Sequence, residues 1–198
     1  MNNDSFFMAH GAGTGHDSDF LKSFGAAFCR SEKLQYVPVT FKYMKDIRST
    51  GKRRPPPKFT SLVEEYLELV CKVQKGNLNI IAGKSMGGRL ATQLSAESFV
   101  SGIVCFGFPF YQQGKPEKHR LSFLEKLEKP CLIFQGTRDA FGRPEWVNKQ
   151  ELPDCVTIHW IEGADHDFEL LKSQKKTCEQ TIEEMVYILN QWIKKTVV

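Results

Sequence analysis

The chain has 198 residues, 41% hydrophobic and 25% charged, which is typical of a globular protein and excludes a wholly disordered one. No apolar run approaches the ~20 residues of a membrane-spanning helix, and residues 6–9 are too short for the core of a signal peptide. The net charge is +4, but residues 42–58 hold seven basic residues and one acidic residue, so the remainder carries −2. A basic character confined to one segment argues against a nucleic-acid-binding protein.

These properties indicate one domain spanning residues 1–198, located in the cytoplasm and bound to neither membrane nor nucleic acid. The six cysteines form no CxxC pair and show no zinc-ligand spacing. We therefore expect reduced thiols, no metal and no cofactor.

Strand-like and helix-like segments alternate along the chain, which predicts a sheet covered by helices. In chain order, the apolar patterns of the first half predict a strand at 6–9, a helix at 19–29, a strand at 36–41, a helix at 59–73, a strand at 78–82 and a helix at 89–96. The second half is predicted to contain a strand at 102–106, a short helix at 121–127, strands at 131–135 and 157–161, and a last helix from about 178 to 193. Three prolines exclude regular structure throughout 42–58, and 107–118 is expected to be irregular. The expected fold class is α/β, a three-layer α/β/α sandwich with a mostly parallel sheet of about six strands.

The sharpest local motif is Gly83-Lys84-Ser85-Met86-Gly87, a G-x-S-x-G pattern between a predicted strand and a predicted helix. In such a turn the serine hydroxyl projects above the sheet, and flanking glycines avoid a collision between a Cβ atom and the neighbouring backbone. The motif fixes only three positions, so an ordinary glycine-rich turn is the alternative. Its place at a strand-to-helix junction favours Ser85 as a nucleophile.

A serine nucleophile requires a base and a carboxylate that orients the base. Asp139 and His166 each follow a predicted strand, in the chain order of the α/β-hydrolase triad. The carboxyl ends of parallel strands lie at one edge of a sheet, where such sites form. Asp165 and Asp167 are alternatives to Asp139, but they are too close in sequence to the base to orient it easily.

Residues 10–15 read His-Gly-Ala-Gly-Thr-Gly after the first strand, and this turn resembles the oxyanion loop of lipases and esterases. In that reading the amides of Ala12 and Met86 are the oxyanion donors, and His10 is a candidate for substrate contact. The glycines do not complete G-x-G-x-x-G and no acidic residue ends the next strand, so a dinucleotide site is disfavoured.

The chain resembles the α/β-hydrolase superfamily in its dienelactone-hydrolase-like branch. More narrowly, it resembles a small family of bacterial hydrolases related to a subunit of a nuclear histone-acetyltransferase complex. The matching segments are residues 9–13, 51–56, 83–89, 107–110, 114–118, 135–139 and 165–166. The resemblance implies an α/β-hydrolase fold. Only five residues precede Phe6, so we expect that fold to lack the N-terminal strand pair, and we expect no large lid.

The expected function is a serine hydrolase of the carboxylesterase or thioesterase type, acting on a small soluble acyl substrate through Ser85, Asp139 and His166. The alternative is a hydrolase fold without catalytic activity, used for binding or as a scaffold. The segment 42–58 suggests an anionic substrate, with Arg53 or Arg54 binding its carboxylate or phosphate. The competing interpretation of this segment is a solvated loop whose arginines pair with surface acids such as Glu64 and Glu65.

Overall fold

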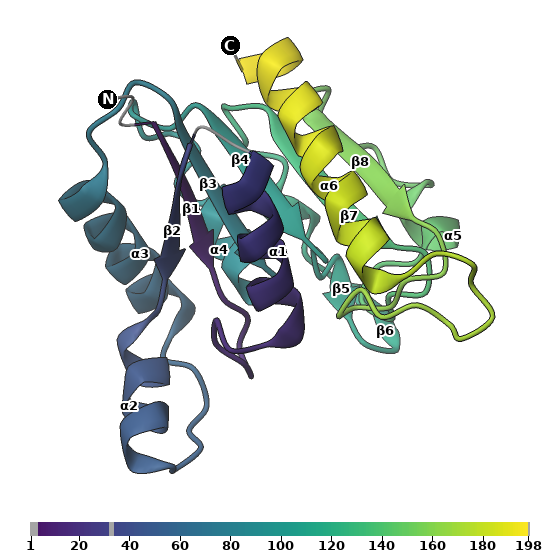
Figure 1. Cartoon of the computed structure of the whole chain (residues 1–198), viewed down its shortest axis with the longest axis horizontal. Coiled ribbons are helices and arrows are strands. Elements are labelled where there is room, and N and C mark those ends of the chain that lie inside the picture. The colour runs from purple at the N-terminus through teal and green to yellow at the C-terminus, as the bar shows by residue number, and fades with distance from the viewer. Residues whose placement is uncertain (1–3, 32–33, 198) are drawn as a thin grey trace.

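A parallel sheet runs through the middle of this computed structural model, which describes residues 4–31 and 34–197 (Figure 1). Its six strands are ordered β2-β1-β3-β4-β7-β8, and every adjacent pair is parallel. The strands are β1 (Ser5–Ala9), β2 (Gln35–Val39), β3 (Asn79–Lys84), β4 (Gly102–Phe106), β7 (Cys131–Gly136) and β8 (Val156–Ile161). The predicted fold class is confirmed.

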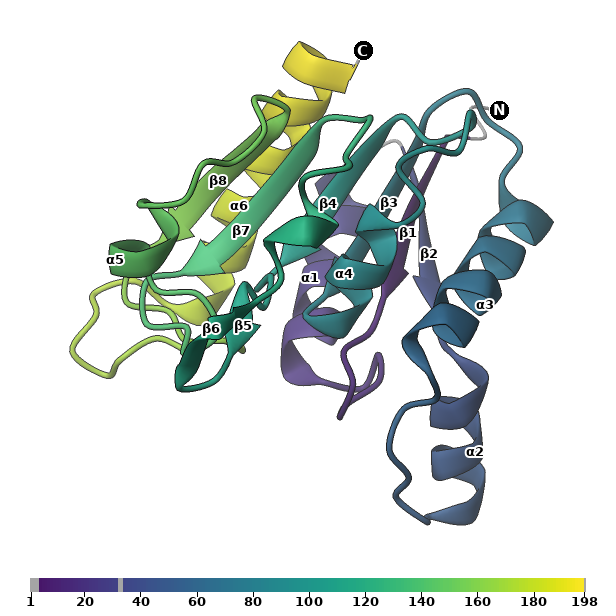
Figure 2. The ribbon, with the colours of Figure 1, turned by 180° about the vertical axis from the view of Figure 1, so that it is seen from behind.

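Helices cover both faces of the sheet, as Figures 1 and 2 show from opposite sides. Helices α1 (Asp19–Ser31) and α6 (Cys178–Trp192) pack on one face, while α3 (Phe59–Val73) and α4 (Met86–Thr92) pack on the other. All residues of the four inner strands β1, β3, β4 and β7 are buried between these layers. Burial on both faces explains why these strands read as continuous apolar runs and not as alternating ones.

Capping residues fix one end of two helices. Helix α6 begins with a capping box, in which Thr177 Oγ1 accepts from the Gln180 amide (3.1 Å) and the Thr177 amide donates to Gln180 Oε1 (2.9 Å). Helix α2 (Lys42–Thr50) ends at Gly51, whose φ of 68° is the left-handed conformation that favours glycine at a helix C-terminus.

Helix α4 begins and ends earlier than the helix predicted at 89–96. The structure differs more strongly from the predicted elements in three other segments. Residues 42–50 form helix α2, so only the proline-containing half of 42–58 is irregular, and α2 projects beyond the carboxyl ends of the strands (Figure 1). Residues 107–118 were expected to be irregular but contain a hairpin, β5 (Tyr111–Gln112) and β6 (Lys115–His119), which turns at Gly114 with φ 70°. The predicted helix at 121–127 is reduced to one 3₁₀ turn, η1 (Leu121–Phe123).

Two short elements were not predicted, α5 (Pro144–Val147) and the π-helical turn η2 (Ile193–Val197). Within residues 4–31 and 34–197, no large lid covers the carboxyl ends of the strands. The described helices include none with both the length and the apolar character that crossing a membrane would require.

Candidate active site

Ser85 lies in the sharp turn between β3 and α4. Its φ of 53° is positive and its ψ is −112°, a conformation that is rare for a residue with a side chain. The Ser85 amide donates to the carbonyl oxygen of Phe106 at the end of β4 (2.9 Å), which fixes the turn to the neighbouring strand. The strained backbone is the geometry that presents a serine hydroxyl above the sheet.

The two glycines of the motif are required by close backbone contacts. A Cβ atom on Gly83 would overlap the carbonyl carbon of Gly87. A Cβ atom on Gly87 would lie 2.7 Å from the carbonyl oxygens of both Ala9 and His10. These distances explain why the turn needs glycine on either side of Ser85.

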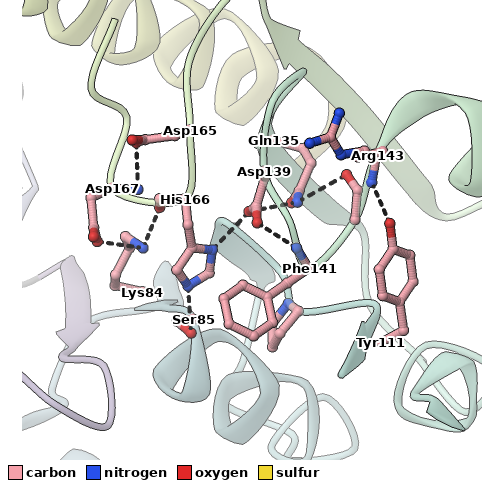
Figure 3. Close-up of polar contacts among 12 residues, drawn as sticks. Lys84, Ser85, Tyr111, Gln135, Asp139, Phe141, Arg143, Asp165, His166 and Asp167 are labelled. Atoms are coloured by element: carbon pink, nitrogen blue, oxygen red, sulfur yellow. Dashed lines mark hydrogen bonds and ion pairs between the residues drawn. The ribbon is translucent and has the colours of Figure 1, made fainter. Parts of the chain in front are cut away.

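The structure brings Ser85, His166 and Asp139 together in one hydrogen-bonded chain (Figure 3). His166 Nε2 lies 2.9 Å from Ser85 Oγ, and His166 Nδ1 lies 2.7 Å from Asp139 Oδ2. Because an ionised carboxylate only accepts hydrogen bonds, Nδ1 is the donor to Asp139. In the neutral imidazole, Nε2 then has a free lone pair that can accept the Ser85 hydroxyl proton.

The carboxylate of Asp139 is fully buried and held at both oxygens. Oδ2 also accepts from Gln135 Nε2 (2.8 Å), and Oδ1 accepts from the Phe141 amide (2.8 Å). These bonds fix the carboxylate toward His166 and stabilise its charge away from water. Asp165 instead accepts from the amides of Asp167 (3.0 Å) and Glu169 (2.9 Å), so it shapes the histidine loop and does not contact the imidazole in Figure 3.

Hydrogen bonds to the backbone and one close backbone approach join the loop that carries Asp139 to the loop that carries His166. Arg138 donates from its amide to the carbonyl of Ala164 (2.9 Å) and from Nη1 to the carbonyl of Gly163 (3.0 Å). The Gly163 amide donates to Thr137 Oγ1 (2.8 Å), and a Cβ atom on Gly136 would overlap the Ala164 carbonyl oxygen. The acid and the base are therefore positioned by one connected unit.

Lys84 and Gln135 contact this unit directly, and sequence reasoning did not identify either as a site residue. The buried Lys84 donates from Nζ to the carbonyl oxygen of His166 (2.5 Å) and lies 3.4 Å from Asp167 Oδ1 (Figure 3). Burial lowers the pKa of Lys84, while the Asp167 carboxylate acts in the opposite direction. The available signal was a polar residue at the carboxyl end of an otherwise apolar strand.

The two expected oxyanion donors lie on either side of Ser85. Met86 is the first residue of α4, so its amide has no partner within the helix. Ala12 is exposed in the loop after β1 and borders the same pockets as Ser85. Tyr43 from α2 holds this loop, since its hydroxyl lies 3.1 Å from the carbonyl oxygen of Ala12 and 3.3 Å from that of Gly11.

His10 does not occupy the substrate-contact position that we expected. Its side chain is fully buried, Nε2 accepts from the Phe41 amide (3.2 Å), and Nδ1 therefore donates to the Gly11 carbonyl (2.7 Å). Burial is the main cause that lowers the pKa of His10 to about 4, so the ring is neutral near neutral pH. The structure makes His10 a support for the glycine loop.

Two pockets meet at Ser85. The larger, of about 810 Å³, lies toward α1 and the histidine loop. The smaller, of about 360 Å³, lies toward α4 and is lined in part by Pro56, Pro57 and Phe59. Residues that border both pockets are Ala12, Ser85 and Phe141.

Arg53 and Arg54 are not at the site. Both are exposed on the segment that follows α2, and neither lines a pocket beside Ser85. In the described residues neither arginine pairs with Glu64 or Glu65, and the ion pair of the basic segment joins Arg48 to Asp17 at 2.7 Å. The part of the segment that lines a pocket beside Ser85 is Pro56 and Pro57, and Arg48 pairs with Asp17 at the edge of the larger pocket.

Comparison with known proteins places this geometry in a family. A family model described as an alpha/beta hydrolase domain matches residues 2–194. An alpha-beta serine hydrolase homologue from Coxiella burnetii is similar in structure, with 18% identity, a TM-score of 0.66, and coverage of 96% of this chain and 85% of that one. Dienelactone hydrolase from Anabaena variabilis is also similar, with 17% identity, a TM-score of 0.69, and coverage of 100% and 88%.

An esterase from Pyrococcus furiosus has 15% identity and a TM-score of 0.69, with coverage of 100% of this chain and 85% of that one. At these identities the structural similarity establishes the fold. The match to the family model extends over nearly the entire sequence, and on that ground the chain belongs to the alpha/beta hydrolase family.

Proposed function

We propose that this protein is a serine hydrolase that cleaves esters or thioesters of small soluble acyl groups. The observation that carries the proposal is the chain of hydrogen bonds from Ser85 Oγ through His166 to Asp139, located where two pockets meet. In the protein without substrate, Ser85 and His166 already lie at hydrogen-bond distance, as a proton transfer between them requires.

In the proposed first step, Ser85 Oγ attacks the carbonyl carbon of the substrate while its proton passes to His166 Nε2. The amides of Met86 and Ala12 stabilise the negative charge that develops on the carbonyl oxygen. Loss of one such donor costs roughly 3–4 kcal/mol of transition-state stabilisation in other hydrolases. Asp139 stabilises the imidazolium that forms.

His166 then returns the proton to the leaving alkoxide or thiolate, and the bond between the carbonyl carbon and the leaving group breaks. This leaves an acyl group on Ser85. A water molecule then attacks the acyl carbon while its proton passes to His166 Nε2. The bond between that carbon and Ser85 Oγ breaks, His166 returns the proton to Oγ, and the acid is released. The open approach to Ser85 suits small substrates, because no large lid in the described residues would shield a long acyl chain.

Labelling with a fluorophosphonate, followed by peptide mapping, tests the proposal without knowledge of the natural substrate. We expect Ser85 to be modified, and we expect Ser85→Ala to abolish both labelling and hydrolysis of 4-nitrophenyl butyrate. Ser101, which lies before β4 and away from both pockets, provides the control variant Ser101→Ala. An unlabelled Ser85 with no hydrolysis would instead favour the binding or scaffold role that the narrower family resemblance allows.

A further inference from the structure

Two arginines line the smaller pocket, which Ser85 also lines. Arg89 lies one helical turn after Ser85 in α4, and its amide donates to the Ser85 carbonyl oxygen (3.2 Å). Arg120 follows the hairpin strand β6 and lines the same pocket. Figure 2 shows α3, α4 and this hairpin on one side of the sheet.

Neither arginine is neutralised by an acid. Across residues 4–31 and 34–197, no carboxylate lies within ion-pair distance of either guanidinium group. Arg120 Nη1 donates to the carbonyl oxygens of Pro109 (3.0 Å) and Tyr111 (2.9 Å), which fixes the group but leaves its charge unbalanced. Nε of Arg89 is buried without a hydrogen-bond partner.

The surroundings of Arg89 hold its guanidinium in place without removing its charge. The group lies 4.9 Å from the ring centre of Phe59 and 5.3 Å from that of Phe123. Burial, and secondarily the neighbouring Arg120 charge, lowers the pKa of Arg89 to about 10, so the group stays protonated at neutral pH. Partial burial of two like charges is unfavourable unless an anion joins them.

The larger pocket has the opposite character. The acidic side chains that line it are Asp17, Asp19, Asp167 and Glu169. Asp17 pairs with Arg48 and Asp167 pairs with Lys84, so Asp19 and Glu169 are the lining acids that have no ion pair in the described residues. An anionic group of a substrate that reaches Ser85 is therefore repelled from the larger pocket and attracted to the smaller one.

We propose that Arg89 and Arg120 form a carboxylate-binding subsite, so that the preferred ester or thioester carries a carboxylate on its acyl part or on its alcohol part. The proposal rests on the hydrolase function proposed above. A guanidinium group suits this role because its planar donors match a carboxylate. The sequence also suggested an anionic substrate, with Arg53 or Arg54 as its binding residue. The residues that we propose to bind the anion are instead Arg89 and Arg120, which line the pocket.

The test compares matched esters. One pair places the charge on the acyl side, the 4-nitrophenyl monoester of adipate against 4-nitrophenyl hexanoate. The other places it on the alcohol side, 4-carboxyphenyl butyrate against 4-carbamoylphenyl butyrate. For at least one pair we expect kcat/KM to favour the anionic ester, and Arg89→Met to reduce that ratio roughly tenfold to a hundredfold, as expected for hydrogen bonds to a charged group.

The variants are chosen to separate charge from folding. Methionine at position 89 keeps an unbranched side chain against Phe59 and Phe123 but removes the charge. Arg89→Lys restores the charge without the planar donors and should recover part of the ratio. Arg54→Gln removes an exposed arginine outside the pocket and should leave the ratio as in the wild type. Equal ratios in wild type and Arg89→Met for both pairs would overturn the subsite.

A binding measurement separates failure of the subsite from failure of the proposed function. Adipate is titrated into Ser85→Ala and into Ser85→Ala/Arg89→Met by calorimetry. Weaker binding to the double variant supports the subsite even if the wild type hydrolyses no ester. Absence of adipate binding to Ser85→Ala, with no preference for an anionic ester in the wild type, refutes it even if neutral esters are hydrolysed.

Discussion

Lys84 Nζ donates to the backbone carbonyl oxygen of His166 over 2.5 Å, so the residue that precedes the proposed nucleophile also holds the loop that carries the proposed base. The two segments are 82 positions apart in sequence, and this contact joins them at the site. A charged side chain at the end of a buried strand is therefore a positioning group for the histidine.

Replacing Lys84 with methionine tests this positioning role. We expect kcat for 4-nitrophenyl butyrate to fall roughly tenfold or more with little change in KM, because a small displacement of the base slows proton transfer, whereas methionine at position 84 changes a single lining residue of the larger pocket. Asp167→Asn is the matched control, since it removes only the partly exposed ion pair with Lys84 and should have a much smaller effect. A rise in KM with unchanged kcat would show that Lys84 acts on substrate binding instead.

The assignment of the acid distinguishes Asp139 from Asp165. Asp139→Asn should lower kcat by roughly 10⁴-fold, because an amide beside Nδ1 favours the imidazole tautomer that cannot accept the serine proton. Asp165→Asn weakens the two hydrogen bonds that loop amides donate to this side chain, and we expect a far smaller loss of activity. Steady-state kinetics of both variants, with folding checked by circular dichroism, decides between them. A larger loss in Asp165→Asn would contradict the geometry at His166.

Burial of neutral His10 predicts a stability that depends on pH. The folded-state pKa of about 4 lies below the ordinary value of 6.5, so the unfolded chain binds the proton more tightly. The free energy of unfolding should therefore be unaffected by His10 above pH 6.5 and should fall as the pH drops toward 4. The expected loss from this group is about 2 kcal/mol between pH 7 and pH 5.

Urea unfolding at pH 7 and pH 5 measures this loss. The difference between the two pH values should shrink in His10→Gln, which cannot titrate. His119→Gln, at an exposed position on β6, should keep the wild-type difference. An identical pH dependence in wild type and His10→Gln would show that His10 is not the group responsible.

The sequence was sufficient to predict the sheet and the proximity of Ser85, Asp139 and His166, and the reason is physical. Buried parallel strands produce apolar runs, and the carboxyl ends of such strands lie along one edge, which brings the residues that follow them to the same place. Helix α2 was missed because few of its residues are buried, with Tyr43 and Met44 facing the core, and because prolines follow it closely.

Arg89 shows what sequence could not indicate. Arg53, Arg54, Arg89 and Arg120 are equivalent as residue types, and they differ in whether packing exposes or buries them and whether an acid lies nearby. His10 shows the same limit, because its position in a glycine turn suggested substrate contact while its ring is used to support the backbone.

The backbone contact at Gly83 leads to a prediction about stability. An alanine Cβ at this position would overlap the Gly87 carbonyl carbon, and its three nearest neighbours are all backbone atoms of Gly87 and Gly88, so no flexible side chain could move away. We expect Gly83→Ala to lower the free energy of unfolding by at least about 3 kcal/mol, since inserting an atom into a packed region typically costs 1–3 kcal/mol even where side chains can adjust. Gly13→Ala is the control, because a Cβ atom there meets nothing within 4 Å. Urea titration of both variants measures the difference. If Gly83→Ala were as stable as Gly13→Ala, the turn would be able to open and admit a Cβ atom. The conclusion that a tight strand-to-helix turn presents Ser85 would then be contradicted.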